Sequence, residues 1–149
     1  MTRAFITGIG GQDGGYLAER LVAEGARVCI TARKQEALDA AVESLGGPDV
    51  AMAVAGRADD PLHQDEVLAA VAETFAPVDL LVNNTGINPA YGRLVDLDLD
   101  AARKIVEVNC IAALSWIQKA VAGGLEERGG GSDVHPAAAV DASLLRGHS

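Results

Sequence analysis

Residues 4–15 read AFITGIGGQDGG, a short apolar run that leads into a turn with five glycines. A tight turn from a strand into a helix needs residues that tolerate positive φ and carry no side chain. The first turn of that helix presents unpaired N–H groups and the positive end of its dipole to an anion. The stretch therefore predicts a first strand, a phosphate-binding turn and a first helix.

An alternation of strand and helix continues along most of the chain. Short apolar strands are expected at 4–8, 27–31, 50–55 and 78–82. Helices are expected at 16–24, at 34–45, from a cap at Asp60 followed by Pro61, and over a long stretch at 98–121. Short apolar strands between helices are typical of a parallel sheet covered on both faces. We therefore expect an α/β fold, the N-terminal half of a Rossmann-type doubly wound parallel sheet, with about four strands and flanking helices.

Composition and charge exclude several classes of protein. The 149 residues are 49% hydrophobic, which is enough for a folded core. Lys and Arg number 12 against 21 Asp and Glu, and the net charge of −9 argues against a nucleic-acid or anionic-membrane partner. No apolar run approaches the ~20 residues of a membrane span, and the start has no leader pattern. Cys29 and Cys110 are too few for a disulfide scaffold, so we expect a cytoplasmic location.

The glycine-rich turn and the end of the second strand favour a nucleotide. A dinucleotide pyrophosphate is the usual occupant of such a turn, although a glycine-rich turn can also carry no ligand. An acidic residue after the second strand holds the ribose of NAD, whereas an Arg accommodates the 2′-phosphate of NADP. Here the strand ends Thr31-Ala32-Arg33-Lys34, with two cations and no acid. We expect NADP(H) to be favoured over NAD(H); the alternative is that Arg33 and Lys34 only begin a solvated helix.

Two further segments carry a family resemblance. Asn83-Asn84-Thr85-Gly86 follows the fourth strand, and Asn109 ends the run Val106-Glu107-Val108-Asn109 in the long helix. Together with the Thr7-Gly8 turn, these segments resemble the short-chain dehydrogenase/reductase family. The stretch 81–114 looks like the branch that includes 3-oxoacyl-carrier-protein reductases. The resemblance implies hydride transfer between NADP(H) and a small-molecule carbonyl or alcohol, and a homo-oligomer by family analogy.

The same resemblance implies roles for individual residues. Asn109 matches the Asn that holds a water in the proton relay beside the catalytic Tyr and Lys; the alternative is a backbone bond within its helix. The implied cofactor contacts are Thr7, Gly8, Gly10, Gly11, Gln12, Asp13, Gly14, Arg33, Asn83 and Gly86.

The chain also departs from the family pattern. Gln12 stands where the usual Thr-Gly-x-x-x-Gly-x-Gly turn has its second Gly, and residues 7, 8, 11 and 14 fit the turn of the family's extended branch instead. Thr85 replaces an Ala of the Asn-Asn-Ala-Gly motif. Arg57 falls near the position where many relatives carry an Asp after the third strand.

The catalytic residues that the resemblance implies are missing. A phenol with a pKa of ~10 needs a nearby cation to act as a base at neutral pH, and the family supplies a Lys four residues after the Tyr. Tyr16 is followed by Arg20 and Tyr91 by Val95. Ser132 precedes the position of the catalytic Ser and is not assigned that role. We expect an inactive oxidoreductase; the alternatives are a non-catalytic nucleotide-binding module or a non-functional remnant.

The last part of the sequence breaks the pattern. Residues 123–149 offer no convincing strand, and a Pro and charges follow Ser132 where an apolar strand should run. We expect an incomplete NAD(P)-binding domain at 1–125, an irregular or poorly ordered tail at 126–149, and a fourth strand left at the edge of the sheet. A truncation or frame shift after about residue 125 would explain the break. The histidines and cysteines lack metal-ligand spacing, so no metal site is expected.

Overall fold

The computed structural model describes residues 2–8, 12–127, 129 and 131–134. Its centre is a five-stranded sheet in the order β3-β2-β1-β4-β5, and every neighbouring pair is parallel. The strands are β1 (Arg3–Thr7), β2 (Arg27–Ala32), β3 (Ala51–Ala55), β4 (Leu80–Asn83) and β5 (Gly131–Val134). Parallel pairing follows from the helical crossovers between short apolar strands. The predicted fold class, a doubly wound parallel sheet, is confirmed.

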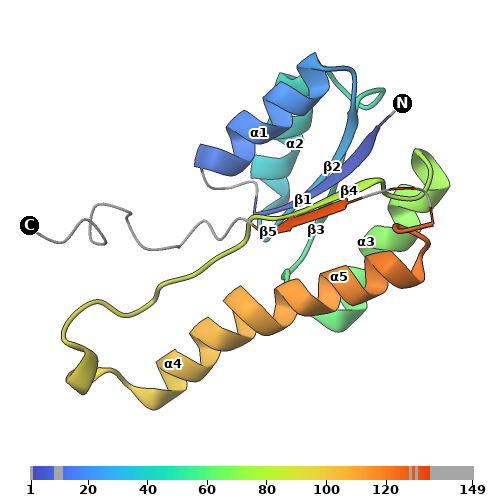
Figure 1. The fold of residues 1–149 in the computed structure, drawn as a ribbon. Coiled ribbons are helices and arrows are strands. Elements are labelled where there is room, and N and C mark those ends of the chain that lie inside the picture. Colours follow the sequence, from blue (N-terminus) through green and yellow to red (C-terminus); the bar gives the residue numbers. More distant parts are fainter. Residues whose placement is uncertain (1, 9–11, 128, 130, 135–149) are drawn as a thin grey trace, which may run out of the picture.

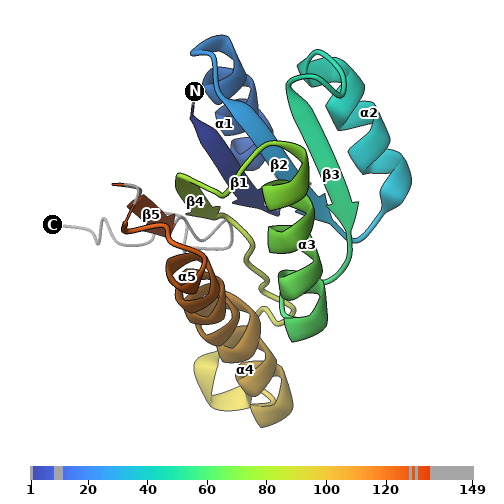
Figure 2. The same cartoon turned by 90° about the vertical axis from the view of Figure 1, so that its right-hand side faces the viewer.

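Helices cover both faces of this sheet (Figures 1 and 2). One face carries α1 (Gln12–Ala23) and α2 (Gln35–Leu45), and the other carries α3 (Pro61–Thr74) and α5 (Ala112–Ala122). Successive side chains of a strand point to opposite faces, so Ile6 belongs to the α1–α2 core and Phe5 to the α3–α5 core. The Phe5 ring packs 4.7 Å from the ring of Trp116, between their centroids. The sheet thus lies between two hydrophobic cores, one on each face.

Local sequence signals explain where the helices begin. The Asp60 side chain accepts a hydrogen bond from the Leu62 N–H, and Pro61 takes the first helical position of α3, as predicted. The first helix begins at Gln12, four positions before the predicted start at Tyr16. Gly14 and Gly15, which were expected in the turn, therefore belong to the start of α1.

The predicted long helix is divided into three segments. It consists of α4 (Leu99–Val106), a π-helical turn at Glu107–Ile111 and α5, and a short 3-10 turn at Leu94–Asp96 precedes it. The whole run Leu99–Ala122 has 24 residues and, by length and composition alone, is apolar enough to cross a membrane. The expectation that no stretch approaches that length is therefore wrong. Its buried side chains Ala112, Trp116 and Ala120 belong to the core of this fold.

A fifth strand corrects the prediction for the end of the chain. β5 lies beside β4, with Gly131 opposite Leu80 and Val134 opposite Asn83. The sequence was misleading because strand pairing uses backbone groups, so a segment without an apolar pattern can pair beside a strand that has one. The prediction that β4 is an edge strand is wrong. Residues 135–149, where the predicted tail continues, lie outside the described residues.

Candidate functional site

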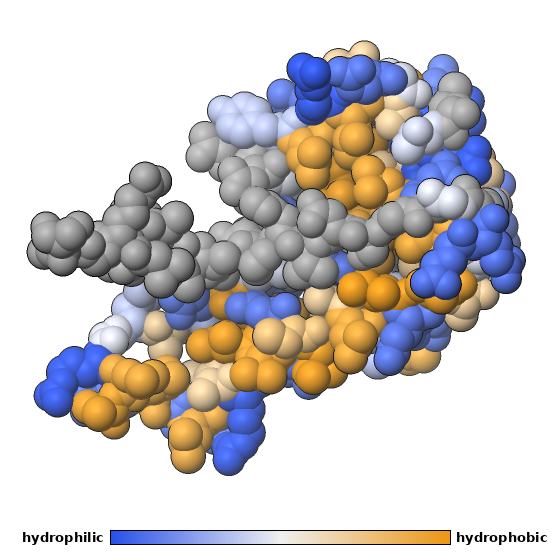
Figure 3. Space-filling model, viewed as in Figure 1, coloured by the Kyte–Doolittle hydropathy of each residue, from blue (hydrophilic) through white to orange (hydrophobic). Residues whose placement is uncertain are grey.

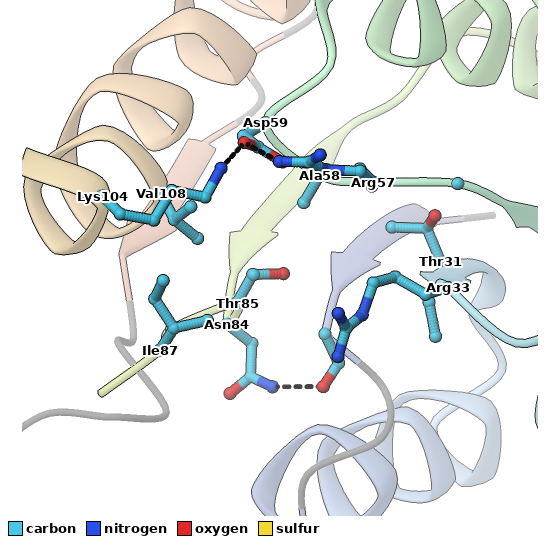
Figure 4. Close-up of a pocket in the computed structure, with 14 residues that line it drawn as sticks. Thr31, Arg33, Arg57, Ala58, Asp59, Asn84, Thr85, Ile87, Lys104 and Val108 are labelled. Atoms are coloured by element: carbon cyan, nitrogen blue, oxygen red, sulfur yellow. Dashed lines mark hydrogen bonds and ion pairs between the residues drawn. The ribbon is translucent and has the colours of Figure 1, made fainter. Parts of the chain in front are cut away.

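A pocket of about 670 Å³ opens at the carboxyl ends of the strands (Figure 4). Its walls come from the segments that follow β1, β2, β3 and β4, and from α4 and the π-helical turn. The chain order reverses here, because β1 has β2 on one side and β4 on the other. Ligands of open α/β sheets bind at such a switch point, and this volume lies in the range of small-molecule sites.

The ends of β1 and β4 are joined by side-chain hydrogen bonds. The Thr7 hydroxyl oxygen accepts from the N–H groups of Asn84 and Thr85, both at 3.0 Å. Asn84 in turn donates from Nδ2 to the Gly8 carbonyl at 3.0 Å. Gly8 has a φ of 69°, and a Cβ there would lie 2.8 Å from Cα of Thr85. Only glycine fits this position, so backbone rather than side chain borders the pocket beside β1.

The predicted phosphate-binding residues divide into two groups. Gln12, Asp13 and Gly14 form the first turn of α1, the helix that follows β1. Gly10 and Gly11 lie outside the described residues. Gly14 does not line the pocket, and the anion site at this helix start stays a prediction.

Three cationic side chains and one carboxylate line the pocket. Arg33 follows β2, Arg57 follows β3, Lys104 lies on α4, and Asp59 is the acid. Figure 4 shows the guanidinium of Arg33 extending toward Asn84 from the end of β2. Among the described residues, no carboxylate forms an ion pair with Arg33. The excess of positive charge suits an anionic ligand.

Asp59 forms ion pairs with two of these cations, Arg57 and Lys104. Its Oδ2 atom lies 2.8 Å from Nη2 of Arg57 and 2.6 Å from Nζ of Lys104, and its side chain is only 12% exposed. Burial opposes ionisation, but the hydrogen bonds and charges of Arg57 and Lys104 outweigh it and lower the pKa of Asp59 to about 2. The carboxylate therefore stays ionised and fixes both cations at neutral pH.

The two predicted asparagines make contacts between elements. Asn109, in the π-helical turn, accepts from the Ile87 N–H at 2.8 Å through Oδ1 and donates to the Ile87 carbonyl at 2.9 Å through Nδ2. The alternative of a bond within its own helix is wrong for this side chain. Asn83 is buried, and its Nδ2 makes a long contact of 3.5 Å with the Ala113 carbonyl. Both contacts connect the segment after β4 to the long helix.

The fold brings to the site several residues that no sequence motif assigned. Asn84 had a signal, because it is the second Asn of the quoted motif, but the contact of its side chain with Gly8 depends on the pairing of β1 with β4. Asp59 and Lys104 are 45 residues apart and gave no joint signal. Tyr91 is 90% exposed, and neither Tyr91 nor Tyr16 lines the pocket.

Comparisons with known proteins find relatives of this chain. Dehydrogenase/reductase SDR family member 4 of Oryctolagus cuniculus is 34% identical over 122 residues, 79% of this chain and 45% of that protein. Its namesake in Caenorhabditis elegans is 34% identical over 118 residues, 78% of this chain and 45% of that protein. The chain thus spans less than half the length of these relatives.

Solved structures also align with this chain over about half of their own length. A structure of actinorhodin polyketide ketoreductase with NADPH aligns with a TM-score of 0.81 at 31% identity, over 89% of this chain and 52% of that chain. A short chain dehydrogenase/reductase of Saccharomyces cerevisiae has a TM-score of 0.82 at 20% identity, over 90% and 53%, and shows the fold alone. The family model described as short chain dehydrogenase matches residues 2–135. The chain therefore belongs to the short chain dehydrogenase family.

Proposed function

We propose that the pocket binds NADP(H), in preference to NAD(H), as the cofactor-binding part of an oxidoreductase. The observation that carries this proposal is the guanidinium of Arg33 in the pocket, with no ion-paired carboxylate among the described residues. A 2′-phosphate would give Arg33 the charge-assisted hydrogen bonds that NAD(H) lacks. The relative whose structure contains NADPH is consistent with this choice.

The residues present fit a dinucleotide at its phosphates and adenosine. Gly8 and Gly86, from the segments after β1 and β4, both line the pocket. The first turn of α1 would face the pyrophosphate. The cofactor, when bound, supplies a hydride donor or acceptor. This chain binds and orients it through the segments after β1, β2 and β4, which the hydrogen bonds of Thr7 and Asn84 hold together.

We propose further that the 149 residues bind the cofactor without turning over a carbonyl or alcohol substrate. Neither tyrosine of the chain has a Lys four residues later. Ser115, the serine on α5, donates its hydroxyl to Oε1 of Gln64 at 2.6 Å on the α3 side of the helix. Asn109, in the π-helical turn, would be one member of a proton relay. The sequence does not supply the Tyr and Lys that such a relay needs.

A second copy of the chain is the proposed partner of the long helix. Leu99, Val106, Ile111 and Leu114 are exposed, and apolar side chains gather along this helix in Figure 3. An exposed apolar patch of this kind is typical of an association surface. Light scattering after gel filtration would give the mass of a dimer or tetramer if the proposal is right and that of one chain if it is wrong.

Thermal unfolding tests the proposed cofactor. A ligand that binds only the folded chain raises the melting temperature in proportion to the logarithm of its concentration. NADPH should raise the melting temperature more than NADH at equal concentration. A cooperative melt that neither nucleotide moves would contradict the proposal and favour the non-functional remnant.

A further inference from the structure

A buried histidine lies directly behind one wall of the pocket. His63, in the first turn of α3, is 5% exposed, and its Nε2 atom is 2.8 Å from Oγ1 of Thr31 at the end of β2. Thr31 and Gly56 line the pocket, and a Cβ built on Gly56 would overlap Nδ1 of the His63 ring. The imidazole therefore occupies the space between the end of β2 and the loop after β3.

The hydrogen bonds of Thr31 determine which ring nitrogen of His63 carries the proton. Oγ1 of Thr31 lies 2.7 Å from the Val54 carbonyl oxygen, which can only accept, so the single hydroxyl proton of Thr31 is donated to Val54. Oγ1 must then accept from His63. The neutral ring is protonated at Nε2, and its unprotonated Nδ1 faces Gly56.

Among the described residues, a second proton on the ring has no hydrogen-bond partner, because Thr31 is the one partner of the ring and it already meets Nε2. The second proton would bind at Nδ1, on the side of the ring that faces Gly56. Trp116 of α5 stands edge-on to the imidazole, with centroids 6.4 Å apart and an interplanar angle of 89°. Burial lowers the pKa of His63. The negative charges of Glu66 and Asp60 raise it, but they offset only part of the effect of burial.

The other charged groups around α3 do not reverse the lowering of the His63 pKa. Lys119 of α5 donates to the Pro61 carbonyl and to Asp65, so α5 offers His63 only the neutral Trp116 ring. On the loop after β3, Arg57 pairs with Asp59. On β2, burial raises the pKa of the Cys29 thiol, which is therefore uncharged.

We propose that neutral His63 is a positioning residue for the wall that carries Arg33 and Arg57, and that protonation of His63 weakens dinucleotide binding. This inference rests on the proposed function. His63 fixes Thr31, two residues before Arg33, against Gly56, the residue before Arg57. A ring that gains a proton at Nδ1 must move away from Gly56 or turn toward a new acceptor. Either movement displaces the β2 end relative to the loop after β3.

The test compares the Kd of NADPH for the unchanged chain and for His63→Gln between pH 8 and pH 5. The Gln side chain keeps an N–H donor for Thr31 and does not titrate. At pH 8 the two Kd values should agree within about threefold, because the variant keeps the hydrogen bond to Thr31. Below the pKa of His63, the unchanged chain should lose up to about tenfold in affinity per pH unit relative to the variant. The 2′-phosphate titrates with a pKa near ~6, but it does so equally with both proteins, so the comparison cancels it.

Two controls keep the result specific. The double variant His135→Gln/His148→Gln should retain the pH profile of the unchanged chain. Nitrogen-15 NMR of the free chain should show His63 protonated at Nε2, and the Thr31 and Gly56 amide signals should shift with the same midpoint as the ring.

The outcomes separate the two proposals. If NADPH binds and the ratio of the two Kd values stays constant with pH, or if NMR finds His63 protonated at Nδ1, the positioning role is wrong and the proposed function stands. If neither protein binds NADPH at any pH, the proposed function fails, and the role of His63 in binding fails with it.

Discussion

Lys104 on α4 places its Nζ atom 2.6 Å from Oδ2 of Asp59, and this ion pair joins the long helix to the loop after β3. Arg57 completes the arrangement at 2.8 Å from the same oxygen. One buried carboxylate thus holds two cations that border the pocket. Loss of Asp59 would remove both ion pairs at once, whereas loss of either cation would remove one.

Asp59→Asn should therefore destabilise the fold. A pKa lowered from 3.8 to about 2 corresponds to roughly 2 kcal/mol of free energy of unfolding at neutral pH. Because the pKa is lower in the folded chain, this contribution is present above pH ~4 and is lost as the pH falls toward ~2. Urea unfolding at pH 7 and pH 3 would measure both effects. The control Asp100→Asn breaks an exposed pair with Arg103 and should change the free energy by less than about 0.5 kcal/mol. Equal losses for the two variants would refute the role of Asp59.

Arg33→Gln tests the preference for NADP(H). Loss of charge-assisted hydrogen bonds to the 2′-phosphate should weaken NADPH binding about 10- to 100-fold, whereas NADH binding should change little. Fluorescence titration of both nucleotides gives the two constants. Lys34→Gln, at the next position, is the matched control and should leave the ratio of the constants unchanged. If Arg33→Gln weakened both nucleotides equally, the guanidinium would not be reading the 2′-phosphate.

Gly8→Ala should disrupt the turn after β1. The positive φ strains any side chain, and the new Cβ would meet Cα of Thr85 at 2.8 Å. We expect a loss of about 1–3 kcal/mol in the free energy of unfolding and the loss of measurable NADPH binding. Gly15→Ala is the control, because a Cβ at that helical position meets nothing within 4 Å and should stabilise the helix by up to ~1 kcal/mol. Chemical denaturation that ranks the two variants in the opposite order would count against the described turn.

Thr85→Val should stabilise the chain in the absence of ligand. The Thr85 hydroxyl oxygen is buried and has no hydrogen-bond partner among the described residues. Replacing it with a methyl group of the same shape should raise the free energy of unfolding by about 1 kcal/mol. Thr31→Val is the matched control, because it removes a hydroxyl that makes two hydrogen bonds, and it should lower that energy by about 1–2 kcal/mol. A destabilising Thr85→Val would mean that the hydroxyl has a partner in solution.

The fold was largely predictable because its signals are local. Apolar strands, the cap at Asp60 and the turn at Gly8 are each read within a few residues. β5 was missed because its pairing with β4 depends on backbone groups and on neighbours about 50 positions earlier in the chain. Of the residues that motifs singled out, Arg33 and Gly86 line the pocket and Asn83 does not, and their roles toward a cofactor stay predictions. Asp59, Lys104 and His63 were not assigned, because their roles arise from contacts across elements.

We propose above all that the pocket prefers a dinucleotide with a 2′-phosphate. Isothermal titration of the unchanged chain with NADPH and with NADH, at one pH and one salt concentration, measures this preference directly. NADPH should bind saturably, and the Kd for NADH should be at least about tenfold higher, since one charge-assisted contact is worth roughly 1.5–3 kcal/mol. Equal Kd values, or tighter binding of NADH, would contradict the claim.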